Sequence, residues 1–253
     1  MHPPPSTKER LMKRFDVAQG STEWRRLRAG KPTASQFHRI FTAKTCKPSS
    51  SAPGYRYELL AELIMGRPMD SVKTYDMARG TALESDAAAW YAFQCDIEPE
   101  VVGFCTTDDE KIGASPDRLI GSDGLLELKG PSPSQHIEYM LFPKRGVDTD
   151  YKVQVQGQLY VCERDWCDIC SYHPELPRVI VRVERDDAYI KQLERELKIF
   201  VDELELARID FERIYGKIEP KGLGECPEFI SDADLEAILA RRKAEITPTE
   251  SRA

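Results

Sequence analysis

The sequence has no apolar run that approaches the roughly 20 residues needed to cross a bilayer, and it has no internal repeat. The first residues, Met1-His-Pro-Pro-Pro-Ser6, lack the apolar core of a secretory signal. The four histidines are scattered, without the paired spacing of zinc ligands, and no glycine-rich phosphate loop of the ATPase type is present. These absences predict a cytoplasmic protein with no membrane contact, whose seven cysteines are reduced thiols.

Length and composition fit a soluble globular protein, with 253 residues, 41% of them hydrophobic and 31% charged. A chain of this length can bury one substantial core. We expect residues 1–14, proline-rich and then basic, to form a flexible arm, and residues 15–216 to form one domain. Residues 217–253 predict a linker and a short capped helix, which would dock on the body of the protein or on a partner.

The formal charge of −7 is distributed unevenly along the chain. Residues 8–47 hold eleven Lys or Arg against three Asp or Glu, a balance of +8, whereas residues 183–253 hold twelve against eighteen, a balance of −6. A basic first segment suits a protein that meets DNA on one face. Ordinary solvated helix surfaces would explain the same charges equally well.

The hydrophobic periodicity predicts both helices and strands. Helical spacing covers residues 23–30, 33–41, 55–65, 77–93, 134–141 and 186–214. Strand-like runs cover residues 101–107, 112–120, 125–129, 168–173 and 179–183. The segment 148–161 is expected to begin as a helix and to run into a strand. This mixture predicts an α/β fold.

One segment concentrates residues that can carry chemistry. Gly121-Ser-Asp-Gly124 has the composition of a turn between two short strands. Because side chains alternate along a strand, Glu127 and Lys129 should share a face, and the hairpin can bring Asp117 beside them. Two carboxylates and a lysine can bind a hard divalent cation and hold an activated water. The pattern indicates a metal-dependent phosphodiesterase, although a solvated, salt-bridged strand face would show the same residues.

Four motifs follow one another along the chain: Trp24-Arg-Arg-Leu-Arg28 with Thr33-Ala-Ser35, Arg79-Gly-Thr-Ala-Leu-Glu-Ser-Asp-Ala87, Ser115-Pro-Asp117 through Glu127-Leu-Lys129, and Gln154-Val-Gln-Gly-Gln-Leu-Tyr160. In this order and at these spacings, the chain resembles the lambda-type exonucleases, also called YqaJ-like viral recombinases, of the PD-(D/E)xK nuclease superfamily. The likeness runs from about Asp16 to Tyr215.

The resemblance implies a restriction-endonuclease-like core, with a central mixed sheet flanked by helices. It also implies Mg²⁺-dependent, processive 5′-to-3′ digestion of linear double-stranded DNA, which releases mononucleotides and leaves a 3′ single strand. Relatives of this kind form ring-shaped homotrimers and pass that strand to a single-strand annealing protein in phage recombination. The expected compartment is therefore the cytoplasm of a bacterial or phage-infected cell.

The resemblance also assigns roles at the metal site. Asp117 and Glu127 are expected to bind two Mg²⁺ ions, which Mn²⁺ can replace, with the backbone carbonyl of Leu128 as a further ligand. Lys129 is expected to orient and help deprotonate the attacking water. Glu84 should face the metals from a helix, directly or through water, although an exposed helical glutamate is the commoner case.

Gln154 and Gln156 belong to the last of the four motifs. The resemblance places Gln154 near the catalytic lysine and the scissile phosphate. The two side chains share a face if the segment is extended, whereas helical geometry would separate them. Gln156 is therefore only a candidate for DNA contact.

A 5′-phosphate pocket is implied at Arg28, Ser35 and Ser115, whose guanidinium and hydroxyls suit a phosphate. Trp24 is expected to pack beneath this pocket, or to contact DNA. The relatives carry a further arginine at the position of Gln135. Either Lys144 or Arg145 replaces it, or the enzyme depends less on the phosphate. Further candidates for DNA contact are Met77, as an apolar wedge, and Lys44 and Lys47.

Other interpretations of the sequence remain open. A structure-selective or site-specific endonuclease of the same superfamily would use the same catalytic residues, and a non-catalytic protein could bind DNA ends with the same fold. Cys162, Cys167 and Cys170 have part of the spacing of an iron–sulfur site. Since free cysteines are commonly buried, we expect these three to lie in the core of the sheet instead.

Overall fold

Two β-sheets organise the part of the chain that the structure, a computed structural model, describes: residues 12–69, 75–146 and 151–218. The smaller sheet is antiparallel, in the order β1 (Met12–Phe15), β3 (Phe104–Thr107), β4 (Gly113–Ala114). The larger sheet has the order β2 (Glu100–Val101), β5 (Arg118–Ile120), β6 (Gly124–Lys129), β7 (Trp166–Ser171), β8 (Val179–Glu184). Only β6 and β7 pair in parallel within it, which makes the sheet mixed.

The parallel register begins where Gly124 pairs with Trp166. The indole ring lies over this glycine and leaves no room for a side chain there. The same register sets Glu127 opposite Ile169 and Lys129 opposite Ser171. A tight contact at one end of β6 therefore determines where its charged residues stand.

The strands predicted over residues 101–107 and 112–120 are each split between the two sheets. The first breaks at Gly103, where any side chain would collide with the backbone of Val17. The second breaks at Pro116, which has no N–H to donate to a ladder. The short crossing Ser115-Pro116-Asp117 thus carries the chain from one sheet to the other.

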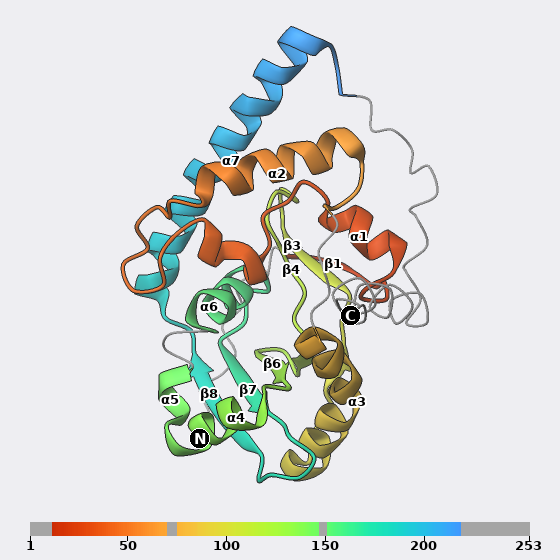
Figure 1. Ribbon diagram of the computed structural model, residues 1–253, viewed down its shortest axis with the longest axis vertical. Helices are drawn as coiled ribbons and strands as arrows, with labels where there is room; N and C mark the ends of the chain where they lie inside the picture. Colours follow the sequence, from red (N-terminus) through yellow and green to blue (C-terminus); the bar gives the residue numbers. More distant parts are fainter. Residues whose placement is uncertain (1–11, 70–74, 147–150, 219–253) are drawn as a thin grey trace, which may run out of the picture. The chain divides into compact units, whose positions relative to one another are not determined.

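Eight helices are described, and together with the sheets they confirm the predicted α/β class (Figure 1). They are α1 (Thr22–Arg28), η1 (Ala34–Arg39), α2 (Ala52–Met65), α3 (Tyr75–Cys95), α4 (Pro133–Leu141), α5 (Pro143–Gly146), α6 (Lys152–Val161) and α7 (Asp187–Tyr215). The helix predicted over residues 33–41 is a 3₁₀ helix, η1. Ser21 caps α1 and Asp186 caps α7, each by accepting a hydrogen bond from a first-turn N–H.

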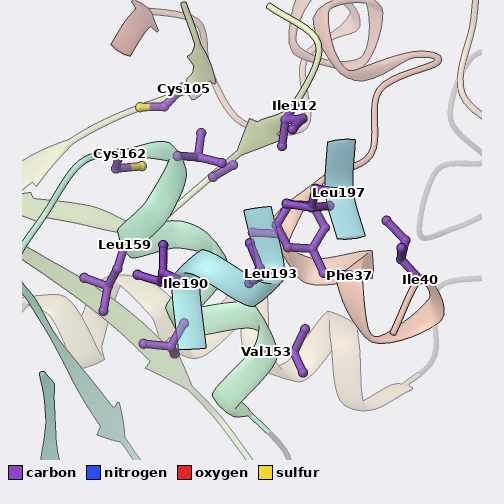
Figure 2. Close-up of a cluster of buried hydrophobic side chains, with 14 of the residues drawn as sticks. Phe37, Ile40, Cys105, Ile112, Val153, Leu159, Cys162, Ile190, Leu193 and Leu197 are labelled. Atoms are coloured by element: carbon purple, nitrogen blue, oxygen red, sulfur yellow. The ribbon is translucent and has the colours of Figure 1, made fainter. Parts of the chain in front are cut away.

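The main core lies where η1, α6 and α7 meet. Figure 2 shows Phe37 from η1, Val153 and Leu159 from α6, and Leu193 from α7 converging in this cluster. Helix α6 approaches η1 closely because it carries Gly157, where an added Cβ would lie 2.6 Å from the ring of Phe37. This packing fixes the position of α6, which is the helix that returns the chain from β6 to β7.

A second, smaller cluster joins α3 to the larger sheet. Tyr91 from α3 packs with Leu126 and Cys170, and its hydroxyl donates to Asp168 Oδ2 at 2.7 Å. Arg182 donates to both oxygens of the same carboxylate, at 2.8 and 2.9 Å. The larger sheet is therefore packed against helices through both of its faces.

The ends of the chain differ from the expected boundaries. The predicted arm over residues 1–14 is too long, because residues 12–14 belong to β1 and pair with β3; residues 1–11 lie outside the described residues. The chain divides into two compact units, Met1–Pro220 and Lys221–Ala253, and the predicted tail helix lies outside the described residues. No described helix is long and apolar enough to cross a membrane.

Candidate active site

The larger sheet presents an acid and a lysine side by side on β6. Glu127 is 4% exposed, and its Oε1 accepts a hydrogen bond from Lys129 Nζ at 2.6 Å. The intervening Leu128 packs with the second core cluster on the opposite face. The strand alternation expected from the sequence therefore brings these two charged groups together.

Asp117 reaches the same point from the crossing between the sheets. Its Oδ2 accepts a hydrogen bond from the backbone N–H of Leu128 at 2.5 Å. Burial, followed by the negative charge of Glu127, raises the pKa of the Asp117 carboxyl well above its ordinary value, against the opposing effect of Lys129. The Glu127 carboxylate thus lies close enough to disfavour the ionised form of Asp117, an arrangement that a cation relieves.

Helix α6 contributes two glutamines to the site. Gln154 Nε2 donates to Glu127 Oε1 at 2.5 Å, and Gln158 Nε2 donates to Glu127 Oε2 at 2.8 Å. The two residues are four positions apart and therefore lie on one face of the helix. Gln154 takes the expected place, with its amide oxygen 3.4 Å from Lys129 Nζ, whereas Gln158 was not among the predicted residues.

Lys129 is enclosed on its other side by Tyr151. The ammonium lies 4.7 Å from the centroid of the Tyr151 ring, a distance typical of a cation–π contact. Burial lowers the pKa of Lys129, but the charges of Glu127 and Asp117 outweigh burial and the pKa is raised. Lys129 is therefore an ammonium ion, able to donate hydrogen bonds, at neutral pH.

Glu84 comes from α3 but is turned toward a different partner. Arg118 Nη1 contacts Glu84 Oε1 at 3.3 Å and donates to the backbone carbonyl of Asp117 at 2.6 Å. The charge of Glu84 still raises the pKa of Asp117 slightly. Glu84 therefore lies beside the carboxylate pair without joining it, and Arg118, directly after Asp117 in the sequence, is a neighbour of the site that was not predicted.

The donor set suits a hard cation such as Mg²⁺. Asp117 and Glu127 supply carboxylate oxygens, the ligands that Mg²⁺ prefers, and Mg²⁺ commonly keeps several waters besides one or two carboxylates. Within the described residues, no group of three His, Cys, Asp or Glu side chains forms a complete metal cage. The site fits a metal held by two carboxylates, with water and substrate oxygens for the remaining positions.

A second polar cluster lies at the other end of the Ser115–Asp117 crossing. Arg28 donates to Ser115 Oγ and to Thr33 Oγ1, both at 3.1 Å, and its guanidinium lies 4.3 Å from the ring centroid of Trp24. Trp24 Nε1 also donates to Ser115 Oγ at 3.0 Å. Burial lowers the pKa of Arg28 to about 10. Hydroxyls accept these side-chain hydrogen bonds from the partly buried guanidinium, and the charge of Glu62 acts on it as well. A guanidinium held by hydroxyls suits the binding of an anion.

The structure places the other predicted phosphate ligands less closely. Ser35 is exposed at the start of η1, and Thr33, two residues earlier, takes the hydrogen bond from Arg28. Gln135 donates to Tyr139 Oη at 2.8 Å. Lys144 and Arg145 are exposed on α5. Thr33 is thus the hydroxyl that complements Ser115, and its place in the first motif was the signal for it.

The remaining residues predicted to contact DNA, Gln156, Lys44, Lys47 and Met77, differ in their exposure to solvent and in whether the structure describes their side chains. Gln156 is 2% exposed, donates to the carbonyl of Glu184 and accepts from the N–H of Asp186, both at 2.9 Å. The structure therefore gives Gln156 a role in packing α6 against the start of α7, away from solvent. Lys44 and Lys47 are exposed on the loop after η1. Met77 lies on α3, but its side chain lies outside the described residues.

The three spaced cysteines separate between the two cores. Cys162 and Cys167 belong to the main cluster, where Figure 2 shows Cys162 beside Cys105. Cys170 belongs to the second cluster, since its position on β7 has the opposite parity to that of Cys167. Burial raises the pKa of the Cys167 thiol well above its ordinary value. These positions agree with cysteines in the core of the sheet.

The family model of the YqaJ-like viral recombinase domain matches residues 23–165, more than half of the chain. The matched span begins in α1 and includes Asp117, Glu127, Lys129 and Gln154. The chain belongs to the YqaJ-like viral recombinase family. No curated protein matches the sequence.

Solved structures agree with this YqaJ-like assignment. The alkaline exonuclease LHK-Exo of Laribacter hongkongensis is 34% identical, with a TM-score of 0.68 over 77% of this chain and 97% of that one. Its complex with dAMP gives 33% identity and a TM-score of 0.67 over the same shares. A phage-related exonuclease from Haemophilus somnus 129PT, 14% identical, shares the fold with a TM-score of 0.57 over 72% and 96% of the two chains. The predicted PD-(D/E)xK core is thereby confirmed.

Proposed function

We propose that this protein is a Mg²⁺-dependent 5′-to-3′ exonuclease of linear double-stranded DNA. The observation that carries the proposal is the convergence of Asp117, Glu127 and Lys129 in a member of the YqaJ-like family. The similarity to the alkaline exonuclease LHK-Exo, also solved with a deoxynucleoside monophosphate, supports DNA hydrolysis to mononucleotides.

The reaction we infer is a displacement by water at phosphorus. A water oxygen forms a bond to phosphorus, the P–O3′ bond breaks, and the 3′ oxygen leaves with a proton. Mg²⁺ held by Asp117 and Glu127, with the Leu128 carbonyl as a candidate third ligand, would supply an acidified water and charge neutralisation. Lys129 is proposed to orient the attacking water, to help in its deprotonation and to neutralise charge on the phosphoryl oxygens.

Gln154 and Tyr151 support this role of Lys129. Gln154 bridges the carboxylate and the ammonium, and the Tyr151 ring closes the remaining side. These contacts hold the ammonium beside Glu127. Such preorganised donors act without rearrangement as charge develops on the phosphoryl group.

The polar cluster around Arg28 is proposed to hold the 5′-phosphate of the strand being digested. Cleavage of the P–O3′ bond leaves a new 5′-phosphate on the shortened strand. Each turnover thus regenerates the group that Arg28 and Ser115 would bind, which supports processive digestion. The proposal extends to the assembly typical of the family, a homotrimer that encloses DNA and delivers the 3′ single strand to an annealing protein.

The decisive test compares linear duplex DNA with a covalently closed circle, each with Mg²⁺ and with EDTA. We expect Mg²⁺-dependent release of mononucleotides from the linear substrate alone. Cleavage of the circle would assign an endonuclease instead, and end binding without turnover would assign a non-catalytic role.

The Arg28→Gln variant should lose the preference for phosphorylated ends. Removing a charged hydrogen bond costs about 1.5–3 kcal/mol, so release of the first nucleotide from 5′-phosphorylated DNA should slow roughly 10- to 100-fold. Release of the first nucleotide from 5′-hydroxyl DNA should be almost as fast as before. Arg26→Gln, on the exposed side of the same helix, serves as the matched control. Equal slowing on both ends would show that Arg28 acts only by packing against Trp24.

A further inference from the structure

Gln158 stands where the packing of α6 favours an apolar residue. It is 1% exposed, and its helical neighbours Val155 and Leu159 are buried in the main core. Burying an amide costs free energy unless its polar atoms find partners. A glutamine at this position therefore requires an explanation beyond packing.

The Gln158 amide satisfies only one of its two ends within the described residues. Nε2 donates to Glu127 Oε2 at 2.8 Å, whereas its own Oε1 is buried without a hydrogen-bond partner. Because an ionised carboxylate can only accept, the NH₂ group must be the end that faces Glu127. The hydrogen bond to Glu127 is thus the interaction that explains a glutamine at this buried position.

The two oxygens of Glu127 are divided between different partners. Oε1 accepts from Lys129, which acts at the reacting phosphate in the proposed mechanism, and from Gln154, which supports Lys129. Oε2 accepts from Gln158 behind them. Without Gln158, donors would hold the carboxylate at one oxygen only, and the terminal torsion of a glutamate is otherwise broad.

We propose that Gln158 is a positioning residue that fixes the plane of the Glu127 carboxylate for binding of a divalent cation. This inference rests on the proposed function, because it assumes that Glu127 binds the metal. Groups that orient a metal ligand in this way typically change metal affinity about 10- to 100-fold when removed. Gln158 acts through Glu127 and does not touch the substrate.

The test is calorimetric titration of the full chain with Mn²⁺, without DNA, for the unaltered protein and for Gln158→Met, which keeps the length of the side chain. We expect Mn²⁺ to bind the variant about tenfold more weakly. Nuclease rates should then require more Mg²⁺ for half-saturation and should recover at high Mg²⁺. Gln158→Asn, too short to reach Glu127, should behave in the same way and replaces Gln158→Met if that variant does not fold.

Gln156→Met is the matched control. Gln156 has the same residue type, helix and burial, but bonds only to backbone groups of Glu184 and Asp186. The Gln156→Met variant should have a lower melting temperature than the unaltered protein and the same affinity for Mn²⁺. If Gln158→Met also changes only the melting temperature, the inference is overturned. If the unaltered protein binds neither Mn²⁺ nor Mg²⁺, both the proposed metal dependence and the inference about Gln158 are wrong.

Discussion

Replacing Lys129 with methionine should slow DNA cleavage by about 10³-fold or more, because positioned proton donors and electrostatic contacts at a reacting centre each contribute factors of this order. Within the described residues, Lys129 is the cation that contacts Glu127 directly, and its raised pKa keeps it charged. Binding to DNA ends should persist, since Arg28 and Ser115 are unchanged. Single-turnover cleavage with Mg²⁺ and end binding with Ca²⁺ separate the two effects.

Lys13→Met provides the control for loss of a lysine–glutamate pair. Lys13 bonds to Glu110 at 2.7 Å, with both side chains 46% exposed, and exposed pairs contribute little to stability. Its cleavage rate should match that of the unaltered protein. If Lys129→Met cleaves within tenfold of that rate, Lys129 is only a structural partner of Glu127.

Asp117→Asn should abolish metal-dependent cleavage and, in the absence of metal, make the protein more stable at neutral pH. The Asp117 pKa is raised by burial and by the charge of Glu127, so the folded state disfavours the ionised carboxylate relative to the unfolded chain. An asparagine removes that penalty. In a domain of this size about 1 kcal/mol corresponds to a shift of roughly 2–4 °C in melting temperature.

The pH dependence of this stabilisation follows from the direction of the shift. The penalty is fully present above the raised pKa of folded Asp117, and it disappears as the pH falls toward the ordinary aspartate value of about 4, because both states are then protonated. Melting curves in EDTA at pH 5 and pH 8 should therefore show a larger gain at pH 8. Added Mg²⁺ should stabilise the unaltered protein but not the variant.

Asp16→Asn is the control for removing a carboxylate from an exposed site. Asp16 is 76% exposed and bonds to Arg14, so its loss should leave the melting temperature almost unchanged. A lower melting temperature for Asp117→Asn at both pH values would contradict the inference that burial and the charge of Glu127 disfavour ionised Asp117.

The catalytic face of β6 could be predicted because it depends on a local rule. Alternation along a strand sets Glu127 and Lys129 on one face regardless of what surrounds them, and the glycine-rich turn before β6 fixes the hairpin. Gln154 was predicted from the family resemblance alone. It lies far from Lys129 in the sequence, so no local rule relates the two residues. The long amphipathic helix α7 was equally accessible, since its apolar spacing persists over many turns.

The break between β4 and β5 could not be predicted from hydrophobic pattern. Residues 112–120 look like one strand, and only Pro116 interrupts the hydrogen-bonding potential. Gln158 was missed for a related reason: Gln154 and Gln156 attract attention as an alternating pair, whereas in a helix the partner of Gln154 lies four residues on. Both features depend on which sheet or helix the segment joins, which is decided by tertiary packing.

The contact of Trp166 with Gly124 also determines how folding errors would appear in a purified sample. If β6 slipped by one residue against β7, all of its side chains would exchange faces. Glu127 and Lys129 have the same parity, so they would leave the site together, and no molecule would keep half of the pair. A preparation that contained misfolded protein would then be a mixture of fully active and fully inactive molecules. Titration of active sites, rather than the mean rate, would measure the active fraction.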